Sequence, residues 1–236
     1  MVVPIQVFFP VSVESTLLFF LFSLFFSVLT FVKRTFSLNG IIFGNFVGLL
    51  VFLLGGIQSF FVLVVFFVLG EFATVYSRSK TKVKHETRNS FNVFGNTVAP
   101  LLFLFFGQTT SFFGGISAAL SDTLSSEIGL LSKKKPMLIT TFKEVKAGTN
   151  GGVSFLGTAV SFFGAIVCAG IYFLFFHNAL LAFFVFVAGI VGSITDSLLG
   201  ALFENKGKLD KTQVNFFATL SGALVVLILQ ALTSML

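Results

Sequence analysis

The amino-acid sequence predicts an all-α, polytopic integral membrane protein with about eight transmembrane helices. Of the 236 residues, 56% are hydrophobic and only 10% are charged, whereas charged residues make up about a quarter of an ordinary soluble domain. All 15 Lys and Arg residues fall in four short segments. The apolar stretches around these segments have room for spans of about 20 residues each. We therefore expect a single transmembrane domain over residues 1–236.

Each apolar segment is expected to form one span, and short uncharged breaks such as Gly55-Gly56 and His177-Asn178 separate neighbouring spans. The segments are 11–32, 38–54, 58–76, 91–106, 111–130, 153–175, 179–203 and 213–235.

The basic segments lie in alternate loops, which predicts how the chain is oriented. They are Lys33–Arg34, Arg78–Arg88, Lys133–Lys146 and Lys206–Lys211. Because cytoplasmic loops are enriched in Lys and Arg, this pattern places the four basic loops in the cytoplasm and both termini outside. The net charge of +6 thus indicates topology rather than nucleic-acid binding. The expected location is the plasma membrane, with the site facing the cytoplasm.

Five acidic residues lie within or directly after the predicted spans 58–76, 111–130 and 179–203, and an ionisable side chain within a span is costly and usually marks a functional site. They are Glu71, Asp122, Glu127, Asp196 and Glu204. All three spans that carry them run from outside to inside, so the acids are expected to gather at one depth on the cytoplasmic side. Whether Glu71 and Glu204 take part in the site stays open, because Glu204 is near a span end.

Asp122 and Asp196 share a local pattern, Ser121-Asp122-Thr123-Leu124 and Thr195-Asp196-Ser197-Leu198. Small residues on the same helix face, including Gly192 and Gly200, which lie four residues before and after Asp196, allow close helix packing around it. Glu127 is turned by about 140° from Asp122 on the same helix, so these two acids do not easily reach one atom. Two helices can bring Asp122 and Asp196 together, and such a pair suits Mg²⁺. A proton or sodium relay is the alternative.

The loop before segment 153–175 has the composition of a phosphate site. Gly148–Gly152 directly precedes a helix, where glycines let backbone N–H groups face an anion and the helix dipole favours negative charge. Lys143 and Lys146 add positive charge nearby. The alternative is an ordinary turn with a helix cap. A second basic loop leads into Asn92 and Asn96, whose amides suit a phosphate or a cap.

Several segments together resemble one known family. They are Ser121–Gly129, Ser132-Lys133, Leu138–Thr141, Gly148–Ser154, Gly192-Ser193, Asp196–Ala201, Leu209-Asp210, Val214–Phe216, and Arg88 with Val93 and Asn96. They resemble the transmembrane-protein-19-like family, also known as domain of unknown function 92, which includes the plant phytyl-phosphate kinases. The chain departs from that pattern at Leu124, where a Trp is usual, at Met137, where a basic residue is usual, and at Ser90 and Asn92.

The resemblance implies phosphoryl transfer from a nucleoside triphosphate, CTP or another, to an isoprenyl monophosphate in the lipid bilayer. The implied catalytic residues and Mg²⁺ ligands are Asp122, Glu127 and Asp196. The implied nucleotide- and phosphate-binding residues are Arg88, Asn96, Lys133, Thr141, Lys143, Gly148, Thr149, Asn150, Gly151 and Asn215. Two other functions stay open: a membrane nucleotidyltransferase that makes a nucleoside-diphospho-lipid, and an ion- or proton-coupled transporter.

Overall fold

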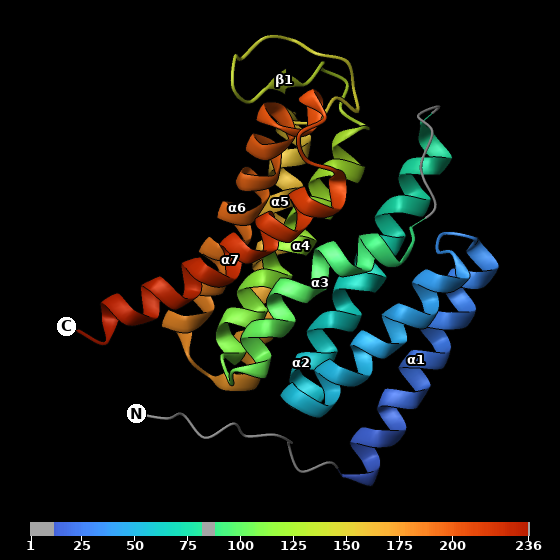
Figure 1. The fold of residues 1–236 in the computed structure, drawn as a ribbon, viewed down its shortest axis with the longest axis vertical. Helices are drawn as coiled ribbons and strands as arrows, with labels where there is room; N and C mark the ends of the chain where they lie inside the picture. The colour runs from blue at the N-terminus through green and yellow to red at the C-terminus, as the bar shows by residue number, and fades with distance from the viewer. Residues whose placement is uncertain (1–11, 82–87, 236) are drawn as a thin grey trace.

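The computed structural model describes residues 12–81 and 88–235, and in these ranges the chain forms seven α helices with a loop region at one end (Figure 1). The helices are α1 (Val13–Lys33), α2 (Leu38–Lys80), α3 (Ser90–Phe105), α4 (Thr109–Gly129), α5 (Phe155–Phe176), α6 (Ala179–Leu202) and α7 (Lys211–Thr233). A short 3₁₀ helix, η1 (Glu204–Lys206), lies between α6 and α7. Strands β1 (Met137–Leu138) and β2 (Gly152–Val153) pair antiparallel in the α4–α5 loop, with Met137 opposite Val153.

The described residues form seven helices where the sequence predicts about eight, because segments 38–54 and 58–76 are joined into α2 across a kink. The break predicted at Gly55-Gly56 is a bend inside α2, where Gly56 has φ 67° and ψ −171°. Glycine adopts this backbone without the penalty of a Cβ. A Cβ on Gly48 would lie 3.3 Å from the Phe60 ring. Since twelve residues of straight helix span about 18 Å, the two arms of α2 must fold back on each other.

The chain is an integral membrane protein, and five helices in the described ranges are long and apolar enough to cross a membrane. These are α1, α2, α6 extended to Lys206, α5 and α7. Helix α3 is apolar but has only 16 residues. Helix α4 has 21 residues but carries Asp122, Glu127 and many small polar side chains. By length and composition, five helices in the described ranges are thus candidate spans, and one of them, α2, contains two of the predicted segments.

Helix α4 is the centre of the bundle, since it packs against α2, α3, α5, α6 and α7. Phe112, Phe113 and Ile116 on α4 are fully buried. Small residues allow its neighbours to approach closely: a Cβ on Gly192 of α6 would overlap Ala118. This confirms the packing role expected for the small residues of α6. The polar residues of α4 are tolerated because other helices, and not lipid, surround them.

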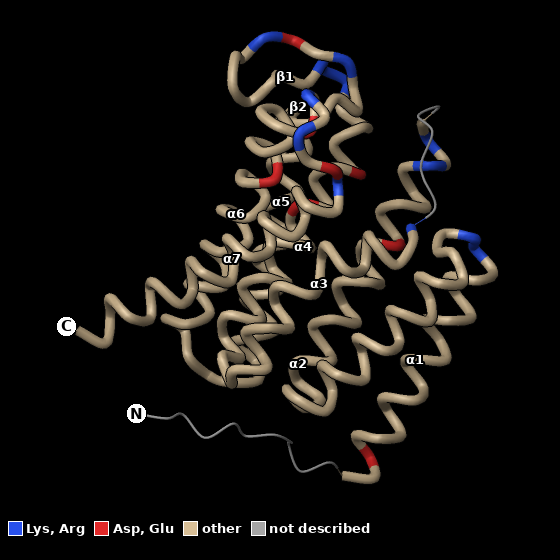
Figure 2. Tube along the Cα trace, viewed as in Figure 1, with Lys and Arg blue, Asp and Glu red and all other residues tan. Residues whose placement is uncertain are grey.

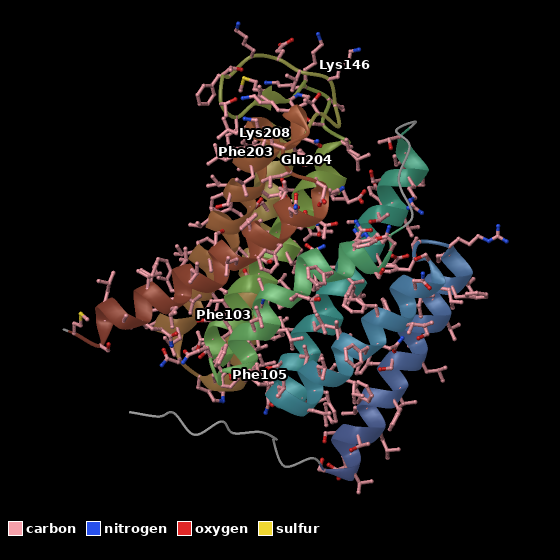
Figure 3. The ribbon with its side chains drawn as sticks, in the orientation of Figure 1. Phe103, Phe105, Lys146, Phe203, Glu204 and Lys208 are labelled. Atoms are coloured by element: carbon pink, nitrogen blue, oxygen red, sulfur yellow. The ribbon has the colours of Figure 1, made fainter. Side chains whose placement is uncertain are left out.

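Charged residues gather at one end of the bundle, apart from one acidic position near the start of α1 (Figure 2). This end carries the α4–α5 loop and the connections α1–α2 and α6–α7, whereas Phe103 and Phe105 lie toward the other end (Figure 3). Lys82 and Lys84 of the second basic segment lie outside the described residues. The remaining basic segments share one end, as the alternation of basic loops along the sequence predicts.

Candidate active site

A polar cleft of about 540 Å³ lies at the charged end, between the start of α3, the second half of α4, the end of α6, the start of α7 and the α4–α5 loop. Most of the residues expected at the site contribute to its lining. They are Arg88, Asn96, Asp122, Glu127, Gly148, Thr149, Asn150, Gly151, Asp196 and Asn215. Its volume is in the range of about 300–1,000 Å³ that is typical of ligand sites.

Three of the expected phosphate-binding residues do not line this cleft. Lys133, Thr141 and Lys143 are exposed on the outer part of the α4–α5 loop. The basic run of this loop pairs with its own acid, since Lys135 Nζ lies 3.4 Å from Glu144 Oε2. Both of these side chains are largely exposed, and such pairs contribute little.

The packing of α4 on α6 brings the two aspartates together. Gly192 packs on Ala118, and one helical turn further along the same faces stand Asp196 and Asp122. Their carboxyl groups interact directly with each other. With its amide oriented to donate, Asn215 Nδ2 lies 3.2 Å from Asp196 Oδ2. We call Asp122, Asp196 and Asn215 the aspartate corner of the cleft.

Lys211 and Glu204 also line the aspartate corner, and both act electrostatically on Asp122 and Asp196. Lys211 is not among the residues expected from the sequence, where it looks like one more basic loop residue. Its spacing of four from Asn215 is the signal that places both on one face of α7. Glu204, whose role the sequence leaves open, belongs to the lining.

The opposite side of the cleft is an ion-paired network around Arg88. Arg88 Nη2 donates to Thr74 Oγ1 at 2.8 Å, and Thr74 Oγ1 donates to Glu127 Oε1 at 3.0 Å. Arg88 Nη2 lies 3.7 Å from the same carboxylate oxygen, and the two side chains are only 16% and 17% exposed. We call Arg88, Thr74 and Glu127 the arginine corner. Glu127 therefore has its hydrogen bond and ion pair here, on the α2 side of α4.

The backbone of Arg88 is held as firmly as its side chain. Arg88 N donates to Thr35 O and Ser37 N donates to Arg88 O, both at 2.8 Å, which joins the start of α3 to the α1–α2 connection. The Phe36 ring lies 5.9 Å from the guanidinium carbon, a cation–π contact. Burial lowers the pKa of Arg88 and Glu127 opposes this shift, but an arginine stays protonated in proteins. Arg88 thus presents a fixed positive charge to the cleft.

Buried Glu71 lies close to this network but does not line the cleft. It interacts electrostatically with Arg88, Arg78 and Glu127. A Cβ on Gly70 would lie 3.3 Å from Arg88 Nη1, so the small residue beside Glu71 leaves space for the guanidinium. The acid that the sequence marks on α2 therefore acts on Arg88 and not on the aspartates.

The glycine-rich segment forms a tight turn that closes the cleft over α6. Gly148 has φ 85° and Gly151 has φ 74°. A Cβ on Gly151 would lie 2.5 Å from Ala201 Cβ and 2.6 Å from Ser197 O. Asn205 Nδ2 donates to Asn150 O at 2.9 Å, which ties the turn to η1. Gly151 thus has a packing role, because only glycine permits this approach to α6.

The asparagines at the start of α3 combine capping with a place in the lining. Asn89 and Asn92 form a capping box, with Asn92 Oδ1 accepting from Asn89 N at 2.8 Å. Asn96 Nδ2 donates to Asn92 O at 2.9 Å, and Asn92 and Asn96 both line the cleft. The cap that the sequence offers as an alternative to phosphate binding is therefore present at Asn89 and Asn92.

The aspartate corner suits a divalent cation whose coordination shell is only partly supplied by the protein. In the described ranges, no group of three or more His, Cys, Asp or Glu side chains could hold a metal ion. Mg²⁺ is commonly held by one or two carboxylates, with waters and substrate phosphates completing its shell. Two facing carboxylates that open onto a polar cleft meet that requirement. The residues that would hold Mg²⁺ are Asp122 and Asp196.

Comparison with known proteins decides the family. A family model described as "Integral membrane protein DUF92" matches residues 21–223. The chain belongs to this family. It is 37% identical over 202 residues to an uncharacterized membrane protein of Methanocaldococcus jannaschii, covering 82% of this chain and 85% of that protein. It is 40% identical over 115 residues to Protein PGR of Arabidopsis thaliana, covering 42% of this chain and 40% of that protein.

A longer but more distant match is to Protein VTE6, chloroplastic, of Arabidopsis thaliana. The two chains are 26% identical over 216 residues, which covers 82% of this chain and 65% of that protein. No solved structure matches the chain. The family that the sequence resembles is thus the family to which the chain belongs, and it includes plant phytyl-phosphate kinases.

Proposed function

We propose that this protein is a membrane isoprenyl-monophosphate kinase of the phytyl-phosphate type, which transfers a phosphoryl group from a nucleoside triphosphate to give the isoprenyl diphosphate. The observation that carries the proposal is the cleft itself. It places two facing aspartates, Arg88 and Lys211 and a glycine-rich turn at the charged end of an apolar helix bundle. Membership of a family that includes the plant phytyl-phosphate kinases supports the same reaction.

The chemistry requires positioning and charge compensation more than covalent help from the protein. An oxygen of the acceptor monophosphate bonds to the γ-phosphorus, the bond from that phosphorus to the bridging oxygen breaks, and nucleoside diphosphate leaves. The acceptor oxygen is already anionic at neutral pH, so no general base is needed. Mg²⁺ bound by Asp122 and Asp196 would neutralise charge on the phosphates. Arg88 supplies a fixed cation on the other side.

The membrane location of the cleft suits a substrate with an apolar tail and a phosphate head. The described residues of the four basic segments lie at the same end as the cleft (Figure 2). By the positive-inside rule, the site then faces the cytoplasm and both termini lie outside the cell membrane. A Lys134→Cys variant in a Cys168→Ser background tests this. Its thiol should resist labelling from outside intact cells, and external labelling would reverse the orientation.

The decisive experiment uses purified protein in lipid nanodiscs with a panel of γ-labelled nucleoside triphosphates and prenyl monophosphates of different lengths. We expect transfer of label to at least one prenyl monophosphate and release of nucleoside diphosphate, dependent on Mg²⁺. An Asp196→Asn preparation, purified in the same way, controls for contaminating kinases.

The identity of the released product separates related functions. Pyrophosphate release with a nucleotide retained on the lipid would mean a nucleotidyltransferase. Uptake of substrate into liposomes without any chemical change would mean a transporter. Either result, or no transfer to any acceptor in the panel, would overturn the kinase proposal.

A further inference from the structure

Two positively charged side chains belong to the described lining of the cleft, Arg88 and Lys211, and their surroundings differ. Arg88 is already bonded to Thr74 and paired with Glu127. Lys211 is exposed and lines the cleft together with Asp122, Asp196 and Glu204, with which it interacts electrostatically. Lys211 therefore stands among negative charges that a divalent cation would compete to neutralise.

The first turn of α7 holds Lys211 in this place. Asp210 caps the helix: its Oδ1 accepts from Gln213 N at 2.9 Å, and Asp210 N donates to Gln213 Oε1 at 3.0 Å. Val214 is buried, and Asn215, one turn after Lys211, contacts Asp196 and the Lys211 carbonyl oxygen. Residues four apart share a helix face. The contact of Asn215 with Asp196 therefore fixes the direction in which the Lys211 side chain emerges.

The lysines of the α4–α5 loop do not share this position. Lys133 and Lys143 are exposed and do not line the cleft, and Lys146 lies at the outer end of the loop (Figure 3). A lysine that binds a phosphate acts as a point charge and must approach it directly. Of the lysines in the described ranges, Lys211 is the one in the lining.

We propose that Lys211 is the lysine that binds the triphosphate of the nucleotide, and that before ligands bind its ammonium group partly offsets the negative charge of the Asp122–Asp196 pair. This inference rests on the proposed kinase function and assigns it a further binding residue. When a metal ion and a nucleotide bind, the metal ion would pair with the two aspartates and the phosphates of the nucleotide would pair with Lys211. The same side chain thus opposes binding of the bare metal ion and favours binding of the nucleotide.

These two roles give Lys211→Met effects of opposite sign, which a merely structural residue would not produce. Without the ammonium group, the nucleotide-free protein should bind Mn²⁺ more tightly, by at least about threefold, because a like charge near the metal is gone. Mn²⁺ uses the same oxygen ligands as Mg²⁺ and serves as the probe. Triphosphate affinity should fall about tenfold or more, the usual cost of losing a charge-assisted hydrogen bond.

The matched control is Lys208→Met, because Lys208 lies in the same connection close to Glu204 (Figure 3) but does not line the cleft. We expect its affinities for Mn²⁺ and nucleotide to equal those of the wild type. Lys211→Arg keeps the charge and should keep wild-type Mn²⁺ affinity. Because Asp210 remains as the cap, both Lys211 variants should fold, and size-exclusion profiles in detergent check this.

The role of Lys211 and the kinase activity are tested by different outcomes of these experiments. If the wild type transfers phosphate and Lys211→Met keeps wild-type affinity for both Mn²⁺ and triphosphate, Lys211 has neither role and the inference is overturned. Weakening of both ligands together would also overturn it, since that result indicates general damage to the site. If the wild type binds a triphosphate with the expected Lys211 dependence but transfers no phosphate, only the kinase proposal falls.

Discussion

The two corners of the cleft differ in how the charge of their carboxyl groups is compensated. In the arginine corner, Glu127 has a cation at 3.7 Å and a hydroxyl donor at 3.0 Å, so its charge is compensated by the protein. In the aspartate corner, two carboxyl groups face each other, with Glu204 nearby and the cation Lys211 beside them. In the first corner the protein itself supplies the cation, whereas in the second two carboxyl groups line the cleft, where a bound cation would stabilise their charged forms.

The difference separates structural from functional polar groups along one helix. Asp122 and Glu127 both belong to α4, five residues apart, yet one points toward α6 and the other toward α2. The arginine corner joins α2, α3 and α4, and its loss should weaken the fold. The aspartate corner should contribute little to stability and much to ligand binding.

The largest effect is expected from Asp122→Asn and Asp196→Asn. Each change keeps the side-chain size but removes a carboxylate that would contact Mg²⁺. Phosphoryl transfer should fall by about a hundredfold or more. Thermal stability without metal should change little, because the aspartate corner contributes little to the fold. Activity assays and thermal unfolding in detergent measure the two effects, and near wild-type activity in both variants would contradict the role of the pair.

In the arginine corner, a loss of stability is expected. Arg88→Met leaves Glu127 and Glu71 without their guanidinium neighbour and should lower stability by about 2 kcal/mol. This is below the cost for a fully buried pair, because the Arg88 side chain is 16% exposed. Unfolding titrations of the variant measure it. In Arg88→Met/Glu127→Gln the loss should be smaller than in the single variant, since no carboxylate at position 127 is left uncompensated.

Gly151 should show how closely the aspartate corner depends on the turn above it. Gly151→Ala adds a Cβ that would meet Ala201 Cβ at 2.5 Å, at a residue with φ 74°. Gly207 has φ 66° and nothing within 4 Å of the position of a Cβ. Gly207→Ala is therefore the control, because it introduces the same kind of backbone strain without a steric clash. Gly151→Ala should therefore be the less stable of the two by about 1 kcal/mol. Equal stabilities would mean that the turn adapts freely.

The meeting of the aspartates could be predicted from the sequence because local rules determine it. Small residues four apart on α6 predict close packing with α4, and Asp196 continues the face that Gly192 begins. The break at Gly55-Gly56 can also be predicted from the sequence. How the two arms of α2 lie against each other cannot, because their arrangement depends on contacts such as that of Gly48 with the Phe60 ring.

The partners within the cleft could not be predicted in the same way. Thr74, Arg88 and Glu127 come from three separate helices or loops, and no periodicity relates them. Lys211 resembles other basic residues beside a span, so the positive-inside rule accounts for it without a site. The lysines of the α4–α5 loop lie near the glycines in sequence, which favours them as phosphate ligands, but Lys143 is exposed between β1 and β2 and does not line the cleft.

The smallest effects are therefore expected for Lys133→Met and Lys143→Met. Both side chains are exposed and outside the cleft lining, and an exposed charge more than about 8–10 Å from a ligand is largely screened at physiological ionic strength. Each variant should change the KM for nucleotide by less than about threefold, and the small change should shrink further at high salt. Lys211→Met, assayed beside them, should raise that KM about tenfold or more. The contrary outcome is an increase of the nucleotide KM in Lys143→Met that equals the increase in Lys211→Met and persists at high salt. This would mean that the α4–α5 loop closes onto the nucleotide and that its basic residues bind the phosphates together with the aspartate corner.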